Sequence, residues 1–319
     1  MAAFDKVVVV GAGAVGGYYG MQLLNSGVEV HFVFRSDYDA VRENGLTIKY
    51  SNGSVQNVLL PHIYASPDVV PPHLAVPVVI LATKTISEQD TLRATLAPVV
   101  TAHTQVILVM QNGIGVEDRL AQMFPQVAVV AAVPYLAASR VEPGVVHHFG
   151  VGAVKLAAQS LRERSDTCVL ERLHEMWTRA SVPCEIMELT TARWRKLCWN
   201  IPFAGLCCKY KKDTMQVIQE HGPELEELIH EVVRAGRACG SDIPDDMTER
   251  IVSLTLSFPA YKPSTLLDLE LGRLIEIQEI FLEPPRLARQ WHCDMPLTEA
   301  LAKELATLNE AVCKGHSKE

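Results

Sequence analysis

The chain carries between residues 6 and 16 the segment Lys6-Val7-Val8-Val9-Val10-Gly11-Ala12-Gly13-Ala14-Val15-Gly16. An apolar β-branched run leads directly into a G-x-G-x-x-G pattern, and a helical segment follows from Tyr18 to Asn25. Strand, tight turn and helix N-terminus in this order are typical of a turn that binds the pyrophosphate of a dinucleotide. We expect Gly11 to permit the turn, Gly13 to let phosphates approach the backbone, and Gly16 to let the helix lie close to the strand. The predicted cofactor-binding loop consists of Gly11, Ala12, Gly13, Ala14, Val15 and Gly16.

The composition is that of a globular protein with two domains. The chain has 319 residues, of which 48% are hydrophobic and 21% charged, and one domain usually takes about 100–200 residues. The formal net charge of −8 argues against nucleic acid and acidic membranes as partners, because both attract a basic surface. A local basic pocket for a small anion is compatible with this charge.

The cysteines and the apolar runs predict a cytoplasmic protein. The eight cysteines are scattered, with no C-x-x-C and no Cys/His cluster at zinc spacing, so we expect reduced thiols and no metal site. Charged residues precede the first apolar run, which speaks against a signal peptide. The longest apolar runs, Leu74–Ala82 and Val127–Ala138, are shorter than the roughly 20 residues of a membrane span.

The residue after the second predicted strand bears on which dinucleotide is bound. This strand covers Val28–Phe34 and is followed by Arg35. An acidic residue here would bind the ribose hydroxyls of NAD, whereas an arginine suits the 2′-phosphate of NADP. The sequence therefore favours NADP (NADPH). Asp37 lies close enough to keep NAD open, and Arg35 also fits an ordinary surface loop.

Several further strands are predicted in the first half of the chain. Leu46–Tyr50 and Val55–Leu60 flank Asn52-Gly53, a strong hairpin signal. The other predicted strands are Val76–Ala82, Val106–Met110, Val127–Val133 and Val151–Ala157. Lys84 and Asn112 each follow one of these strands, and ligands of open α/β sheets gather at the carboxyl ends of strands. We expect both residues to contact a ligand.

From about Thr190 the pattern becomes helical. The predicted helices are Thr190–Lys209, Thr214–Cys239, Asp246–Phe258, Ser264–Arg289 and Leu297–Cys313. We predict an α/β protein in which residues 1–186 form a Rossmann-type, doubly wound parallel sheet and residues 187–319 an all-helical domain. An active site between these two domains is expected.

Lys196 and Asn200 are the candidate reactive pair of the helical domain. They are four residues apart and therefore share one helix face, where an ammonium and an amide can bind a carboxylate and a carbonyl oxygen. Trp194 and Trp199 flank the lysine, and desolvation by such rings lowers a lysine pKa. A solvated basic helix turn is the alternative interpretation.

Taken together, these motifs resemble the ketopantoate reductase family of NADPH-dependent 2-dehydropantoate 2-reductases. The resemblance extends from about residue 6 to residue 305. It rests on the glycine loop, Arg35, Lys84, Gln111-Asn112-Gly113, Glu142-Pro143-Gly144-Val145-Val146-His147 and Arg195-Lys196-Leu197-Cys198-Trp199-Asn200. It implies a C-terminal domain like that of 6-phosphogluconate dehydrogenase.

The resemblance implies a role for each matching residue. Lys196 matches the general acid that protonates the oxyanion, and Glu276 matches a glutamate that contacts this lysine and the nicotinamide ribose. Ser264 matches a serine that binds the substrate carboxylate, and Asn200 is expected to orient the substrate. The remaining matches are cofactor contacts, at Arg35, Lys84, Asn112 and Ala137, of which Asn112 also contacts the substrate. Read without the resemblance, Glu276 is a solvated helical charge and Ser264 a helix N-cap.

Two departures from the family pattern concern the substrate half. Ala204 stands where the family has a second asparagine, which helps to bind the substrate. Pro284-Pro285 falls inside the predicted helix Ser264–Arg289 and should interrupt or kink it.

The resemblance implies reduction of a small 2-oxo acid by NADPH, with 2-dehydropantoate (ketopantoate) as substrate and pantothenate biosynthesis as context. A relative that reduces a bulkier or less polar 2-oxo acid is the first alternative, since Ala204, Phe203, Trp199 and Phe281 suit an apolar substrate. A non-catalytic NADP-binding sensor or partner protein is the second. Monomers and homodimers both occur in the family.

Overall fold

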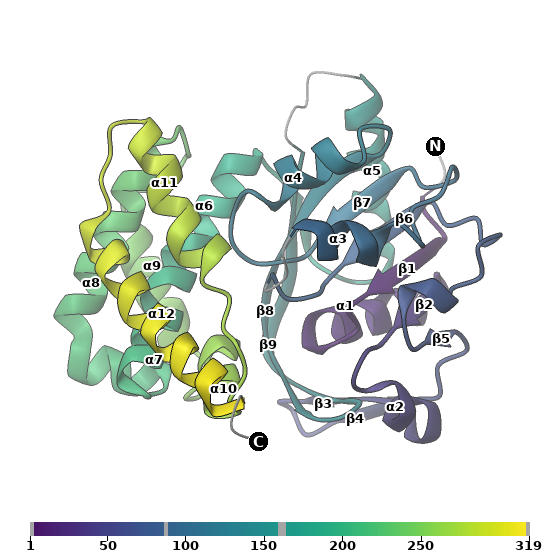
Figure 1. Cartoon of the computed structure of the whole chain (residues 1–319), viewed down its shortest axis with the longest axis horizontal. Helices are drawn as coiled ribbons and strands as arrows, with labels where there is room; N and C mark the ends of the chain where they lie inside the picture. Colours follow the sequence, from purple (N-terminus) through teal and green to yellow (C-terminus); the bar gives the residue numbers. More distant parts are fainter. Residues whose placement is uncertain (1–2, 86–88, 159–163, 317–319) are drawn as a thin grey trace. The chain divides into compact units, whose positions relative to one another are not determined.

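The computed structural model describes residues 3–85, 89–158 and 164–316. The chain divides into two compact units, coloured along the sequence in Figure 1. The first unit comprises Met1–Gln111 and Val116–Leu189, and the second comprises Thr190–Glu319 together with the short segment Asn112–Gly115. Asn112 thus belongs to the helical unit although it follows a strand of the first unit.

The first unit is built on one mixed, mostly parallel sheet. Its central order is β8-β7-β6-β1-β2-β5, and all of these neighbours pair in parallel. The strands are β1 (Lys6–Val10), β2 (Glu29–Val33), β3 (Leu46–Tyr50), β4 (Val55–Val58), β5 (Ile63–Tyr64), β6 (Val78–Leu81), β7 (Val106–Val109), β8 (Ala128–Glu142), β9 (Val145–Ala158) and β10 (Cys184–Ile186). The predicted doubly wound sheet is confirmed.

Helices cover both faces of this sheet. Side chains of α1 and α5 share one apolar core with alternate residues of the strands, and side chains of α3 and α4 share another. The helices are α1 (Ala14–Asn25), α2 (Tyr38–Asn44), α3 (Gln89–Leu96), α4 (Val116–Met123) and α5 (Arg164–Arg179), with a 3₁₀ turn η1 at Pro67–Val69. In β1, Val7 and Val9 face the first core and Val8 and Val10 the second, because successive side chains of a strand point to opposite faces.

The antiparallel part of the sheet agrees only in part with the prediction. β3 and β4 form the predicted hairpin around Gly53, whose φ is +84°. β8 and β9 are much longer than predicted and pair antiparallel around a turn at Gly144, whose φ is +72°. The sequence run after Val133 mixes small and polar residues, so its strand character depends on the neighbouring strands and not on local propensity.

The second unit is helical. Its elements are α6 (Leu189–Trp199), η2 (Asn200–Ala204), α7 (Gly205–Tyr210), α8 (Thr214–Ala238), α9 (Met247–Leu256), α10 (Ser264–Glu270), η3 (Gln278–Leu282), α11 (Glu283–Gln290) and α12 (Pro296–His316). Four of the five predicted helices correspond to helical stretches. The first of them is interrupted by the π-helical turn η2, which contains Pro202; proline lacks the N–H of a regular α-helical hydrogen bond, and a π turn accommodates this.

The predicted helix Ser264–Arg289 is wrong. α10 ends at Glu270, Gly272 adopts a φ of +64°, and residues 273–277 are not helical. Pro284 and Pro285 lie in the first turn of α11, which continues directly from the π-helical turn η3. Proline lacks the N–H of a regular helical hydrogen bond, and the prolines therefore mark the change from π-helical to α-helical geometry.

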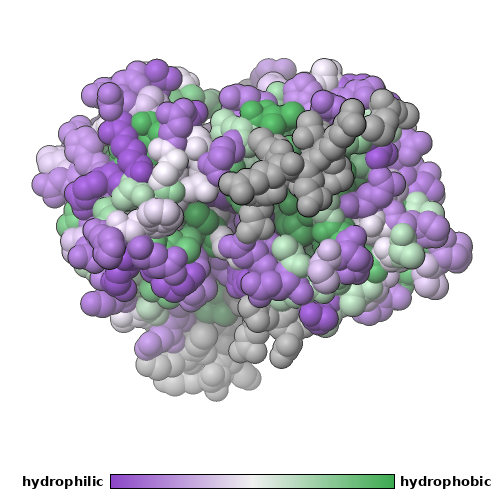
Figure 2. Space-filling view, turned by 90° about the horizontal axis from the view of Figure 1, so that it is seen from above, coloured by the Kyte–Doolittle hydropathy of each residue, from purple (hydrophilic) through white to green (hydrophobic). Residues whose placement is uncertain are grey.

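No helix in the described ranges is long and apolar enough to cross a membrane. Hydrophilic residues cover much of the face shown in Figure 2, with hydrophobic residues between them.

A buried carboxylate fixes the start of α12. Glu231 of α8 accepts hydrogen bonds from the backbone N–H groups of Leu297 (2.9 Å) and Thr298 (2.8 Å) and from the Thr298 hydroxyl (2.7 Å). The side chain is only 2% exposed. Since hydrogen bonds to a charged group are stronger than neutral ones, this contact ties two long helices together.

We expect Glu231→Ala to lower the free energy of unfolding by about 2–4 kcal/mol, because three donors, two of them buried, lose their acceptor. Glu227→Ala, one turn earlier on an exposed position of α8, is the matched control and should change it by less than about 0.5 kcal/mol. Urea denaturation measures both. Equal losses would contradict the assigned role of Glu231.

Candidate active site

The glycine loop of the first unit has the geometry that a bound pyrophosphate requires. Gly11 has a φ of +91°, and a Cβ there would lie 2.6 Å from the Thr83 nitrogen. A Cβ at Gly16 would lie 2.5 Å from the Gly11 carbonyl oxygen, so α1 packs tightly on the turn. A Cβ at Gly13 would meet no atom within 4 Å, which leaves room for a ligand against the backbone.

The N-terminus of α1 points into this space without a capping side chain. Gly13 is its N-cap residue and has no side chain to accept a hydrogen bond. The N–H groups of Gly11 and Ala12 donate to the Val33 carbonyl oxygen (3.3 and 3.1 Å), which fastens the turn to the end of β2. The first-turn amides and the helix dipole favour an anion here.

The loop after β2 separates an exposed arginine from a buried aspartate. Arg35 is exposed, whereas Asp37 is 5% exposed. The Asp37 carboxylate forms an ion pair with Arg140 of β8 and accepts hydrogen bonds from the Ser36 hydroxyl (2.8 Å) and the Gly144 N–H (3.2 Å). Arg140 also donates to the Ser36 hydroxyl at 2.9 Å. Asp37 is thus committed to holding this loop, and Arg35 is the side chain presented to solvent.

Two further predicted cofactor contacts lie on the first unit. Lys84 is exposed and follows β6, next to Thr83, whose backbone nitrogen is close to Gly11. Ala137 is half-buried on β8 opposite Gly150, in a stretch where the register of β8 and β9 shifts. Such irregularities redirect backbone groups that a regular ladder would use.

Lys196 lies half-buried on α6 of the second unit. Its Nζ is 5.7 Å from the centre of the Trp199 ring, close enough for a cation–π contact. Burial lowers the pKa of Lys196 from its usual 10.5 to about 8. Trp194 is buried in the helical core, so of the two flanking tryptophans Trp199 is the one with a described contact to the ammonium.

Asn200 and Asn112 meet within the second unit. The Asn200 side-chain nitrogen donates to the Asn112 side-chain oxygen at 3.4 Å, across 88 positions of sequence. Asn200 begins the π-helical turn η2 directly after α6, and π turns occur often at functional sites. The structure thus brings together the predicted asparagines that follow β7 and α6.

The segment that carries Asn112 is seated on the turn η3. Gly113 has a φ of +87°, and a Cβ there would lie 2.4 Å from Cβ and 2.5 Å from the carbonyl oxygen of Glu279. The Ile114 N–H donates to that same carbonyl oxygen at 3.1 Å. Glycine at position 113 therefore permits a backbone approach that no other residue allows.

Glu276 is buried and lies in the non-helical stretch before η3. Asn309 of α12 holds the neighbouring residue, donating to the Ile275 carbonyl oxygen (3.1 Å) and accepting from its N–H (2.9 Å). The solvated helical charge that the residue pattern alone suggests at position 276 is therefore wrong. Sequence reasoning did not find Asn309, because an asparagine within a long helix gives no local signal of a long-range contact.

Ser264 is exposed and is the first residue of α10, preceded by Pro263 at the N-cap position. The helix-cap interpretation is therefore wrong by one residue. Ala204 ends η2 and is only 3% exposed. Phe203 and Phe281 are fully buried, and all three residues belong to the apolar core of the second unit. Of the aromatic residues named for an apolar substrate, only Trp199 is half-buried instead of buried.

Two family models match the chain, one after the other along the sequence. A family model described as ketopantoate reductase PanE/ApbA matches residues 7–160, and the model of its C-terminal part matches residues 188–309. The 2-dehydropantoate 2-reductase of Nostoc sp. is 30% identical over 309 residues, which cover 95% of each chain.

Solved structures with a similar fold include a member of the same family. A 2-dehydropantoate 2-reductase from Geobacter metallireducens is 34% identical, with a TM-score of 0.85 over 95% of this chain and 99% of that one. A D-mandelate dehydrogenase, solved with NADH and anilino(oxo)acetate, has a TM-score of 0.85 at 20% identity, covering 96% and 99%. At 20% identity, the similarity to the D-mandelate dehydrogenase is evidence of a shared fold alone.

Gly113→Ala should destabilise the second unit more than Gly115→Ala does. Both glycines have a positive φ, +87° and +91°, but a Cβ at Gly115 would meet Glu283 only at 3.4 Å. The left-handed conformation costs about 1–2 kcal/mol in either variant, and the clash with Glu279 adds about 1–3 kcal/mol in Gly113→Ala alone. Denaturant unfolding of both variants measures the difference, and equal losses would show that the segment is not seated as described.

Proposed function

Because the chain belongs to the ketopantoate reductase PanE/ApbA family of oxidoreductases, we propose that it reduces a small 2-oxo acid to the 2-hydroxy acid with NADPH. Ketopantoate is the proposed substrate and pantoate the product. The single observation that carries this proposal is Lys196, a half-buried ammonium whose pKa is lowered to about 8 at the position of the family's general acid.

The proposed cofactor site is the glycine loop with the N-terminus of α1. The open space above Gly13 and the uncapped first turn fit a pyrophosphate. When bound, the nicotinamide supplies the hydride. The residues of the chain then have two tasks, to hold the substrate and to deliver a proton to its carbonyl oxygen.

Lys196 is the proposed proton donor. An ammonium with a pKa of about 8 is largely protonated at neutral pH and yet gives up its proton more readily than an ordinary lysine. Its charge also stabilises the negative charge that develops on the carbonyl oxygen. The proton passes from Nζ to that oxygen, and the resulting amine regains a proton from water.

The remaining site residues are proposed to orient the reactants. Asn200 and Asn112, which are hydrogen-bonded to each other, offer amide groups to the substrate oxygens. Ser264 is proposed to bind the substrate carboxylate, and Glu276 to hold the Lys196 ammonium and the nicotinamide ribose. The rigid backbone at Ile275, held by Asn309, favours a fixed position for the Glu276 carboxylate.

NADPH is preferred in this proposal because of the charges at the end of β2. The Asp37 carboxylate is buried and occupied by Arg140, Ser36 and Gly144, so it is not offered to a ribose hydroxyl. Arg35 remains exposed, and its guanidinium suits a 2′-phosphate. Lys84 and Ala137 complete the proposed cofactor contacts.

An aromatic 2-oxo acid is the second candidate substrate. Ala204 replaces the family's second asparagine, and Trp199, stacked on Phe203 with ring centres 5.3 Å apart, offers an aromatic surface beside Lys196. The D-mandelate dehydrogenase with the same fold holds anilino(oxo)acetate. A third outcome, an NADP-binding protein without catalysis, would bind the cofactor and reduce no 2-oxo acid.

Arg35→Ala should lower kcat/KM for NADPH by roughly tenfold to a hundredfold, the effect of losing one charged hydrogen bond. The rate with NADH should change little, because NADH carries no 2′-phosphate. Arg42→Ala, at an exposed arginine of the nearby helix α2, is the control. Steady-state kinetics with both cofactors measure the preference, and a wild-type enzyme that prefers NADH would overturn the proposed role of Arg35.

Lys196→Ala should reduce kcat by roughly a hundredfold to ten-thousandfold and leave the dissociation constant of NADPH nearly unchanged. In the wild type the protonated lysine is the active form, so kcat should fall as the pH rises through about 8. Lys303→Ala, at an exposed position of α12, is the control. The assay follows NADPH oxidation with ketopantoate beside aryl 2-oxo acids.

The ratio of kcat/KM values in this assay separates the two candidate substrates. Near-normal turnover by Lys196→Ala would end the assignment of the proton donor. Tight NADPH binding without reduction of any 2-oxo acid would favour the non-catalytic alternative.

A further inference from the structure

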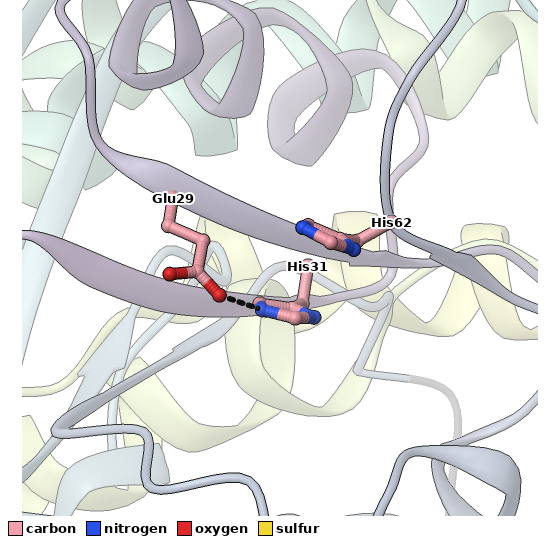
Figure 3. A group of neighbouring side chains, drawn as sticks. All are labelled: Glu29, His31 and His62. Carbon is pink, nitrogen blue, oxygen red and sulfur yellow. Dashed lines mark hydrogen bonds and ion pairs between the residues drawn. The ribbon is translucent and has the colours of Figure 1, made fainter.

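Three potential metal ligands gather on the first unit, and none of them is a residue of the proposed reaction. Glu29 and His31 lie on β2, and His62 directly precedes β5 (Figure 3). Their ligand atoms all lie within 4.8 Å of one another, the one such group among the residues that the structure describes. Glu29 is at the amino end of β2, whereas Arg35 follows its carboxyl end.

The strand geometry brings these three side chains to one face. Glu29 and His31 are two residues apart on a strand and therefore point to the same side of the sheet. β5 pairs in parallel with β2, with Phe32 opposite Ile63, and the Phe32 N–H donates to the His62 carbonyl oxygen at 3.0 Å. His62 is thereby fixed next to His31.

His31 has a partner on each ring nitrogen, in the arrangement that supports metal binding. Its Nε2 lies 2.9 Å from Glu29 Oε1, and its Nδ1 lies 3.0 Å from the hydroxyl of Tyr64. A metal on Nε2 would place the ring proton on Nδ1, where the Tyr64 oxygen accepts it. Such outer hydrogen bonds orient ligating histidines in metal sites.

We propose that Glu29, His31 and His62 bind one divalent transition-metal ion, for which Zn²⁺ is the best match, with water as the remaining ligand. Two imidazoles and a carboxylate are ligands that Zn²⁺ accepts in tetrahedral sites. The rings of His31 and His62 now stack, with centres 4.4 Å apart and planes 13° apart. His62 is half-buried and turns about its side-chain bonds to direct a nitrogen at the ion.

Lys6 is the competitor for this site. Its Nζ lies 3.1 Å from Glu29 Oε1, and partly exposed ion pairs of this kind are weak. A divalent ion would displace the ammonium from the carboxylate. The bound ion joins β2 to the edge strand β5, so its effect is to stabilise this edge of the sheet and not to take part in hydride transfer.

The test uses the tag-free protein, freed of metal by a chelator and then titrated with Zn²⁺ or Co²⁺. We expect one ion per chain, a higher melting temperature with Zn²⁺, and the visible absorption of tetrahedral Co²⁺. His62→Ala should abolish the Co²⁺ spectrum, and Tyr64→Phe should weaken binding by roughly tenfold to a hundredfold. Lys6→Met should tighten binding, a gain that misfolding cannot imitate.

His103→Ala, at an exposed histidine elsewhere on the same unit, is the matched control and should bind as the wild type does. The proposal is overturned if neither ion binds, or if His62→Ala and Lys6→Met bind as the wild type does, which would indicate nonspecific surface histidines. Reductase activity does not enter this test, so its outcome is independent of the proposed reaction.

Discussion

The close approach of α1 to the first turn is the constraint on which the first unit depends. Gly11 comes so near to the Thr83 backbone, and Gly16 so near to the Gly11 carbonyl oxygen, that a Cβ on either glycine would overlap a backbone atom. This contact sets the start of α1 directly over the end of β1 and beside the loop after β2. The open space at Gly13 lies within this turn, and the Gly11 and Ala12 N–H groups fasten the turn to the end of β2, shortly before Arg35. A larger residue at either position would separate the helix from the strand.

In the second unit, departures from regular helix geometry position the candidate residues. A π turn at Asn200–Ala204 accommodates Pro202 and starts with the asparagine that contacts Asn112. A second π turn receives Gly113 and Ile114 against Glu279. The non-helical stretch between α10 and this turn carries Glu276.

Burial changes the chemistry of charged groups in opposite ways at the two candidate sites. Lys196 is partly removed from water beside Trp199, and desolvation lowers its pKa to about 8, because the charged form loses hydration. Asp37 is buried as well, but Arg140 and two further donors compensate its charge. Burial thus lowers the pKa of Lys196, whereas burial beside Arg140 leaves Asp37 in a structural ion pair.

The sequence by itself determined the parallel sheet with its glycine turn, the β3–β4 hairpin, most helices and the family, because these depend on local periodicity and on residues close together in the chain. Only the tertiary structure decided that Asn112 lies against Asn200, that Asp37 is paired with Arg140, and that Asn309 holds the non-helical stretch at Ile275. These contacts join residues 88, 103 and 34 positions apart. Their energies depend on burial and on long-range pairing, and neither the hydrophobic pattern nor the spacing of a motif carries that information.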